Sequence, residues 1–263
     1  MSKTSIPSLI QKKQQGEKFA VVTCYDASFA QLVENAGIEA ILVGDSLGMV
    51  LQGHDSTLPV SVDNMVYHTA SVARGCRAPL IISDLPFGSY HSQQQCLDNA
   101  STLMRAGAQL VKLEGGAWLT DSIELLSRAG IPACGHLGLT PQSVNVLGGY
   151  RVQGRNDDQA KHILDGALAL EAAGAAMLVL ECVPQILAAE ITQALRIPVI
   201  GIGAGPQTDA QVLVLHDLLG ITAKTARFVR NFADGSSSIE DALCRYRNAV
   251  LDGSFPAAEH CFD

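Results

Sequence analysis

The 263-residue sequence has little charge and few aromatic side chains. Charged residues make up 17% and aromatic residues 5% of the chain, whereas about 25% charged residues is usual. The net charge is −8 with no basic run, which argues against nucleic acid or an anionic membrane as partner. No stretch approaches the roughly 18 apolar residues of a membrane helix, and residues 1–16 lack the apolar core of a secretion signal. We therefore expect a cytoplasmic protein, with some surface buried between subunits.

Cysteine is present but forms no C-x-x-C pair among its seven occurrences, a pattern typical of reduced thiols in the cytosol. Cys24, Cys134 and Cys182 lie on or beside predicted strands, where we expect them to fill the core rather than act as nucleophiles. With 48% hydrophobic residues the chain can build a sizeable core. A globular enzyme is the leading class, and the secreted, disordered and DNA-binding classes are disfavoured.

A weak internal repeat organises the chain. Three times, a helical pattern ends at a glycine, which tolerates the left-handed conformation after a helix, and a short β-branched run follows. A second kind of strand begins directly after a proline. The glycines are Gly37, Gly107 and Gly174, and the prolines are Pro79, Pro132 and Pro198.

These patterns predict eight strands, at residues 19–24, 39–43, 80–83, 109–113, 133–135, 176–180, 199–200 and 228–232. Helical spacing is clearest at 93–105, at 158–173 and after the capping motif Ser237-x-x-Glu240. Eight strand–helix units in about 250 residues indicate a (β/α)8 TIM barrel. A doubly wound open sheet is the alternative. No linker divides the chain, so we expect one domain over residues 1–263. The long connections 46–63 and 137–157 are either lids or ordinary surface loops.

Acidic residues follow three neighbouring strands. Asp45, Asp84 and Glu114 end the second, third and fourth strands, whose carboxyl ends would share one arc of a barrel rim. Carboxylates that close repel one another unless a cation or proton lies among them, and a few hard oxygen ligands suit Mg²⁺. Alternatively, each acid could cap the helix that follows it.

Other polar residues point to the same rim. Lys112 lies two residues before Glu114, so both side chains point to the same face of the strand. A buried lysine must pair with carboxylates or with an anionic ligand such as a 2-oxo acid. Alternatively, the Lys112 side chain ends in solvent. Glu181, after the sixth strand, is a candidate general base or another helix cap. His136 is a candidate substrate contact, although a lone histidine is more often structural. The run Gly201–Gly205 could bind phosphate or permit a close backbone approach.

Several longer motifs resemble the ketopantoate (3-methyl-2-oxobutanoate) hydroxymethyltransferase family, over about Thr23 to Phe232. These motifs are Val43–Met49, Gly53–Val60, Asp84–Phe87, Val111–Gly116, His136–Gln142, Val152–Arg155, Leu180–Pro184 and Ile200–Gly205.

The resemblance implies a (β/α)8 barrel of the phosphoenolpyruvate mutase-like type, assembled as a homo-oligomer, typically a decamer. It implies transfer of a one-carbon unit from 5,10-methylenetetrahydrofolate to 3-methyl-2-oxobutanoate, giving 2-dehydropantoate on the route to pantothenate. Asp45 and Asp84 are implied as direct Mg²⁺ ligands, and Glu114 as a direct or water-mediated ligand.

The same resemblance implies that Ser46 and Lys112 contact the substrate, which also touches Asp45 and Asp84, and that Glu181 accepts the proton. In the resulting scheme a Mg²⁺-stabilised enolate attacks the folate-borne methylene.

One departure from the family pattern is visible. The family usually has proline before the basic–Phe pair of the eighth strand, whereas this chain reads Thr225-Ala226-Arg227-Phe228, which bears on the path into that strand. Two rival functions remain: a folate-free enzyme that cleaves or rearranges a 2-oxo acid, and a binding protein without catalysis. The acids and Lys112 of the predicted site argue against the second.

Overall fold

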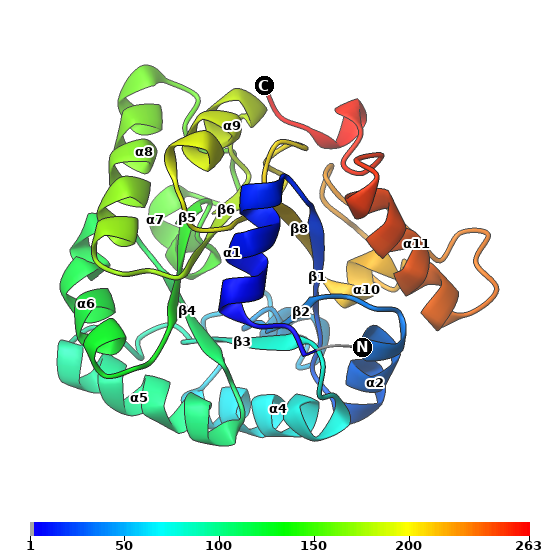
Figure 1. The fold of residues 1–263 in the computed structure, drawn as a ribbon, viewed down its shortest axis with the longest axis horizontal. Coiled ribbons are helices and arrows are strands. Elements are labelled where there is room, and N and C mark those ends of the chain that lie inside the picture. Colours follow the sequence, from blue (N-terminus) through cyan, green and yellow to red (C-terminus); the bar gives the residue numbers. More distant parts are fainter. Residues whose placement is uncertain (1–2) are drawn as a thin grey trace.

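The computed structural model describes residues 3–263 and contains a closed, parallel, eight-stranded barrel (Figure 1). Neighbouring strands pair in chain order, and β8 pairs with β1 to close the ring. This confirms the predicted (β/α)8 barrel and excludes the open sheet. The strands are β1 (Phe19–Thr23), β2 (Ala40–Val43), β3 (Leu80–Asp84), β4 (Leu110–Glu114), β5 (Ala133–Gly138), β6 (Met177–Glu181), β7 (Val199–Ile202) and β8 (Ala210–Leu213).

The predicted eighth strand at residues 228–232 is wrong. The true β8 is Ala210–Leu213, which runs almost directly into the helix at Leu215–Leu218, so the apolar run there hides the strand boundary. Phe232 instead packs edge-on against Tyr246 outside the barrel. The family departure at residues 225–228 therefore lies in a loop rather than in the approach to a strand.

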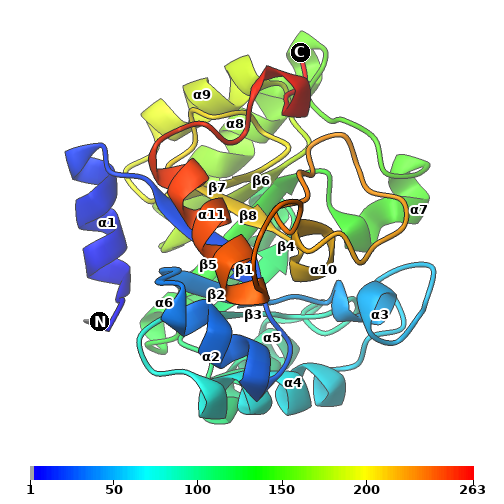
Figure 2. The same cartoon turned by 90° about the vertical axis from the view of Figure 1, so that its right-hand side faces the viewer.

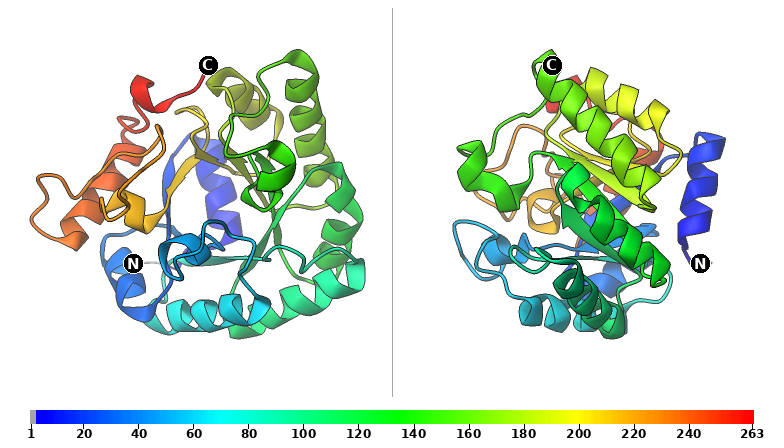
Figure 3. Two further views of the ribbon diagram at one scale, coloured as in Figure 1. Left: turned by 180° about the vertical axis from the view of Figure 1, so that it is seen from behind. Right: turned by 90° about the vertical axis from the view of Figure 1, so that its left-hand side faces the viewer.

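Helices surround the barrel (Figures 1 and 3). Asn156 caps α8, and Ser238, one residue later than predicted, caps α11. No helix within residues 3–263 combines the length and the hydropathy needed to cross a membrane. The helices are α1 (Ile6–Gln15), α2 (Ala27–Asn35), α3 (Leu47–Val50), α4 (Val62–Gly75), α5 (Gln93–Ala106), α6 (Thr120–Arg128), α7 (Val144–Leu147), α8 (Asp157–Ala172), α9 (Gln185–Ala194), α10 (Leu215–Leu218) and α11 (Ile239–Leu251), with short 3-10 turns at Ala117–Leu119, Pro141–Ser143 and Ala258–His260.

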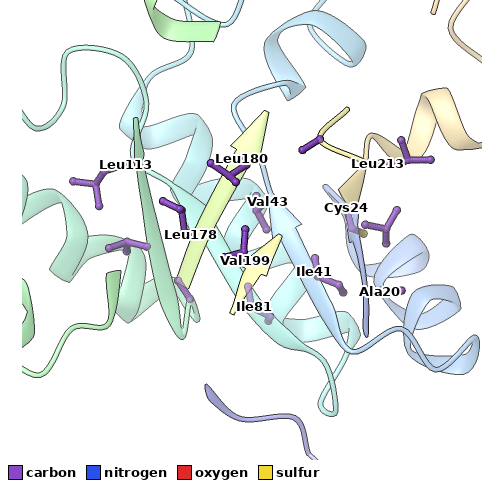
Figure 4. Packing of buried hydrophobic residues seen from close by; sticks show 14 of the residues in the cluster. Ala20, Cys24, Ile41, Val43, Ile81, Leu113, Leu178, Leu180, Val199 and Leu213 are labelled. Atoms are coloured by element: carbon purple, nitrogen blue, oxygen red, sulfur yellow. The ribbon is translucent and has the colours of Figure 1, made fainter. Parts of the chain in front are cut away.

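Alternate residues of each strand face opposite sides of the barrel wall. Outward side chains such as Ile41, Val43 and Leu178 join the large cluster that packs against the helices (Figure 4). Inward side chains such as Leu42 and Val179 form a second, separate cluster inside the barrel. All seven cysteines are free thiols, and Cys24, Cys134 and Cys182 are buried, as expected for core filling.

Helix α1 covers the amino end of the barrel, opposite the end that carries α3 and α7 (Figure 2). Its Leu9 is fully buried in the inner cluster beside Phe19. Lys13 Nζ lies 2.7 Å from Asp209 Oδ2 and 2.8 Å from the Thr192 carbonyl oxygen. Because α1 is anchored in this way, the interior of the barrel faces solvent chiefly at the carboxyl ends of the strands.

Two glutamates connect the glycine-ended helices with the proline-started strands. Glu34 Oε1, in α2, accepts the backbone N–H groups of residues 77–78 at 3.1 and 2.7 Å. Glu171 Oε1, in α8, accepts those of residues 196–197 at 2.6 and 3.0 Å. Each glutamate thus accepts the two backbone N–H groups that come directly before a proline. These hydrogen bonds fix the position at which the next strand begins.

Tyr246 of α11 joins the first and last strands. It is fully buried, and its hydroxyl lies 2.8 Å from both the Val21 and the Gln211 carbonyl oxygens. Because Tyr246→Phe removes the donor but leaves the buried carbonyls, we expect it to lower the free energy of unfolding by about 1–3 kcal/mol. Urea unfolding measures this, with the exposed Tyr67→Phe as control. Equal stability of the two variants would contradict this role for the hydroxyl.

Candidate active site

A cavity of about 590 Å³ opens at the carboxyl ends of the strands. Its floor is charged, while an apolar wall includes Leu42, Val179, Val212 and Phe228. All seven residues predicted to form the site line this cavity, namely Asp45, Ser46, Asp84, Lys112, Glu114, His136 and Glu181.

Lys112 lies among the acids at the base of the cavity. Its Nζ is 3.1 Å from Asp84 Oδ1 and 3.7 Å from Glu114 Oε1, and the lysine is only 4% exposed. Burial lowers the pKa of Lys112, but Asp84, Glu114 and Asp45 together raise it above its ordinary value. Lys112 is therefore a charged, fixed ammonium, and the alternative that it ends in solvent is wrong.

The three acids do not cap helices. Asp84 Oδ2 accepts the Asp45 N–H at 3.0 Å, and Glu114 Oε2 accepts the Gln142 N–H at 2.9 Å. Burial, followed by the charges of Asp84 and Glu114, raises the pKa of Asp45 well above its usual range. Burial also raises the pKa of Asp84, although Lys112 opposes this. The arrangement concentrates negative charge that a cation would neutralise.

His136 connects two carboxylates. Its Nδ1 lies 3.2 Å from Glu114 Oε1 and its Nε2 lies 3.3 Å from Glu181 Oε2. Burial and Lys112 lower the pKa of His136, but Glu114 and Glu181 raise it to about 9, so the imidazole is charged at neutral pH. The Glu181 side chain is 15% exposed and meets the cavity, whereas that of Glu114 is 2% exposed. His136 is thus more than the isolated structural histidine that its sequence position suggested.

Gln142 was missed by sequence reasoning, although it ends the motif His136–Gln142. Its Nε2 donates to Asp45 Oδ2 at 2.8 Å and to the Leu85 carbonyl at 3.0 Å. Its Oε1 accepts a hydrogen bond from the Tyr90 hydroxyl. A reversed amide would bring Oε1 against two acceptors, so the orientation of Gln142 is fixed, and it holds Asp45 as a hydrogen-bond acceptor.

A second missed group supports Ser46. The Tyr25 hydroxyl donates to Thr23 Oγ1 at 2.8 Å and lies 2.9 Å from Ser46 Oγ. Thr23 Oγ1 also accepts the Leu215 N–H at 2.9 Å. This chain of hydroxyls fixes Ser46 at the cavity edge, and no spacing in the sequence points to Tyr25.

Three connections form the mouth of the cavity. The two long connections predicted from the sequence meet there, because the Tyr150 hydroxyl lies 3.6 Å from Met49 Sδ. The third connection, between α10 and α11, contributes residues 224–226. In the run Gly201–Gly205, glycine permits close packing, as one of the two predicted roles required. A Cβ at Gly201 would collide with the Thr208 side chain.

The sequence matches the ketopantoate hydroxymethyltransferase family over residues 3–258. The chain belongs to this family. It is 58% identical to the 3-methyl-2-oxobutanoate hydroxymethyltransferase 2 of Pseudomonas aeruginosa (strain UCBPP-PA14), with full coverage of both chains. It is 59% identical to that of Hahella chejuensis, with 98% of each chain covered. The resemblance seen in the motifs is confirmed, and the chain is an enzyme of this hydroxymethyltransferase class.

Solved structures support the fold. The phosphoenolpyruvate phosphomutase of Streptomyces platensis subsp. rosaceus aligns with a TM-score of 0.63 at 15% identity, covering 83% of this chain and 84% of that one. A 2,3-dimethylmalate lyase, described as a phosphoenolpyruvate mutase/isocitrate lyase superfamily member, aligns with a TM-score of 0.59 at 15% identity, covering 84% of each chain. The fold of the barrel is therefore similar to that of phosphoenolpyruvate mutase-like proteins, as predicted.

Lys112→Met tests the buried charge cluster. It leaves the acids without their cation, so we expect a loss of about 3–5 kcal/mol in unfolding free energy at pH 8. Carboxyl groups whose pKa is raised on folding destabilise the folded protein as the pH rises and they ionise. The loss of unfolding free energy in Lys112→Met should therefore shrink toward pH 5. Urea unfolding across this range measures it.

The control for this variant is Lys161→Met. The exposed ammonium of Lys161 lies 2.8 Å from Asp165 Oδ2, and the pair should contribute at most ~0.5 kcal/mol to the free energy of unfolding. A Lys112→Met deficit that does not change with pH would contradict the charge cluster.

Proposed function

We propose that the enzyme transfers a hydroxymethyl group from 5,10-methylenetetrahydrofolate to 3-methyl-2-oxobutanoate, giving 2-dehydropantoate for pantothenate biosynthesis. The names of its relatives support the keto-acid substrate. The observation that carries the chemistry is the placement of a buried ammonium, Lys112, and a partly exposed carboxylate, Glu181, on one cavity.

The residues present fit Mg²⁺ when substrate and water complete its coordination. Within residues 3–263, no three His, Cys, Asp or Glu side chains are arranged to hold a metal ion alone. However, Asp84 Oδ1 is buried and makes no well-oriented hydrogen bond, although the Lys112 ammonium lies 3.1 Å away. Among the seven predicted site residues, four carboxylic acids also outnumber the basic groups of Lys112 and His136, and a divalent cation would favour the ionised forms of these acids.

Asp45 and Asp84 would hold the ion, and Glu114, already engaged by Gln142 and His136, would act through water. When bound, Mg²⁺ would supply Lewis acidity toward the keto and carboxylate oxygens of the substrate. The folate and the metal are proposals that follow from the family resemblance and from this donor set.

The chain's own residues would then perform the proton chemistry. Lys112 stabilises negative charge that develops on the keto oxygen, and Ser46, fixed by Tyr25, contacts the substrate. Glu181 removes the proton from C3, and that carbon attacks the methylene carbon of the donor as one of its two C–N bonds breaks. Water then replaces the second C–N bond and supplies the hydroxyl group. Tetrahydrofolate leaves, its two nitrogens having taken up the C3 proton and a proton from water. His136 holds Glu181 in place, and the apolar wall of the cavity contacts the branched end of the substrate.

The cavity volume favours a reaction with two substrates. About 590 Å³ exceeds what a small keto acid fills, and leaves room for a donor beside it. The homo-oligomer, typically a decamer, stays a prediction; exposed apolar side chains such as Trp118, Val146 and Ile186 are available for packing against another copy.

Proton NMR of 3-methyl-2-oxobutanoate in D₂O tests the proposed function. We expect Mg²⁺-dependent loss of the C3 proton signal, and hydroxymethyl product once methylenetetrahydrofolate is added. Consumption of the keto acid without folate would support the folate-free rival instead. Absence of any exchange with folded protein and Mg²⁺ would contradict the proposed chemistry.

Glu181→Gln should separate binding from proton removal. Because the amide cannot act as a base, C3 exchange should fall by at least ~10²-fold while keto-acid affinity persists. Glu190→Gln, an exposed change in α9, is the control. Exchange at the wild-type rate in Glu181→Gln would remove Glu181 from the base role.

Asp84→Ala should weaken metal binding. In titrations of free Mn²⁺ by electron paramagnetic resonance, with keto acid present, we expect affinity to fall by at least ~10-fold. The exposed Asp98→Ala in α5 serves as control. A wild-type titration curve for Asp84→Ala would show that the ligand assignment is wrong.

A further inference from the structure

Cys182 is the one non-glycine residue within residues 3–263 that has a left-handed backbone, with φ at 47°. A side chain makes this region unfavourable, and among non-glycine residues Asn, Asp and His are enriched there. Such outliers persist only where the surrounding structure enforces them, often at functional sites. Cys182 directly follows Glu181, the last residue of β6 and the proposed base.

Backbone hydrogen bonds hold this turn from three sides. The Cys182 N–H donates to the Ile202 carbonyl at 2.9 Å, and the Cys182 carbonyl accepts from the Gln153 N–H at 2.9 Å. The Glu181 carbonyl accepts from the Leu139 N–H at 2.8 Å. The partners come from β7, from the connection before α8 and from the end of β5, so the two residues cannot rotate independently of the barrel.

Close packing adds a further restraint. A Cβ at Gly138 would collide with the Glu181 carbonyl oxygen, so β5 lies directly against the turn only because that position is glycine. Gly138 itself has φ at 88°, where glycine is at ease. The structure therefore places a strained residue and a glycine on either side of the same carbonyl group.

The thiol itself does not reach the chemistry. Cys182 is 6% exposed within the outer core cluster and does not line the cavity, and burial raises the pKa of its thiol. Glu181, one residue earlier, lines the cavity and reaches within 3.3 Å of His136 Nε2. The turn at Cys182 thus separates a side chain that points into the site from one that points into the core.

We propose that Cys182 is a positioning residue, whose left-handed conformation aims the Glu181 carboxylate at the carbon that loses its proton. This inference rests on the proposed function, in which Glu181 is the base. The requirement is for the backbone conformation rather than for sulfur. Glycine adopts this conformation readily, whereas the β-branched side chain of valine strongly disfavours it.

Cys182→Val and Cys182→Gly test the proposal, with Cys244→Val as a matched change within helix α11. Keto-acid affinity is measured by calorimetry with Mg²⁺, and C3 exchange by NMR at saturating keto acid. We expect Cys182→Val to lower exchange by ~10- to 100-fold, as small misplacements of a catalytic group do, with affinity within about threefold of wild type. Cys182→Gly should keep a C3 exchange rate within about threefold of the wild-type rate.

Circular dichroism and a thermal melt show whether each variant is folded. Full exchange in folded Cys182→Val would overturn the proposal, as would parallel losses of affinity and exchange. A Cys182→Gly variant as slow as Cys182→Val would also overturn it, because the side chain rather than the turn would then matter. Absence of exchange in the wild type would contradict the proposed function instead, so the two failures are distinguishable.

Discussion

The two-residue alternation of the barrel strands is the constraint on which the site depends. In the β3–β4 register Asp84 stands opposite Lys112, and in the β4–β5 register Glu114 stands opposite His136. These side chains occupy the same inward face as the apolar residues below them, so the charged site is the top of the barrel's own core. A slip of one residue in β4 would turn Lys112 toward the helices.

Charge balance explains why the site needs so many supporting groups. An ammonium and an imidazolium lie among four carboxylates in a region where burial alone would favour their neutral forms. Gln142 donates to Asp45 through its side chain and to Glu114 through its backbone, and both hydrogen bonds lower the pKa of the carboxyl group that accepts them. The site is built for ionic ligands before any ligand arrives, which is the preorganisation that electrostatic catalysis requires.

Much of this was predictable from the sequence, because barrels place strand ends on one rim. That rule alone brought Asp45, Asp84 and Glu114 together and put Lys112 beside them. What the sequence could not reveal depends on contacts between distant segments. Gln142 and Tyr25 act through hydrogen bonds with no periodic signature. Strand β8 has four residues and runs almost directly into the short helix α10. Phe228 and Phe232 lie in a loop, and their burial there produces the apolar pattern that predicted a strand at residues 228–232.

The paired glutamates at the amino end of the barrel also bear on how such a chain could arise. Glu34 precedes β2 and Glu171 precedes β6, and each fastens the segment that leads into the following strand. In a ring of eight strands those positions are four apart, half a revolution from one another. A barrel assembled by doubling a four-stranded ancestor would carry matched fasteners at that interval. The two halves of this chain share this matched contact at the amino end of the barrel.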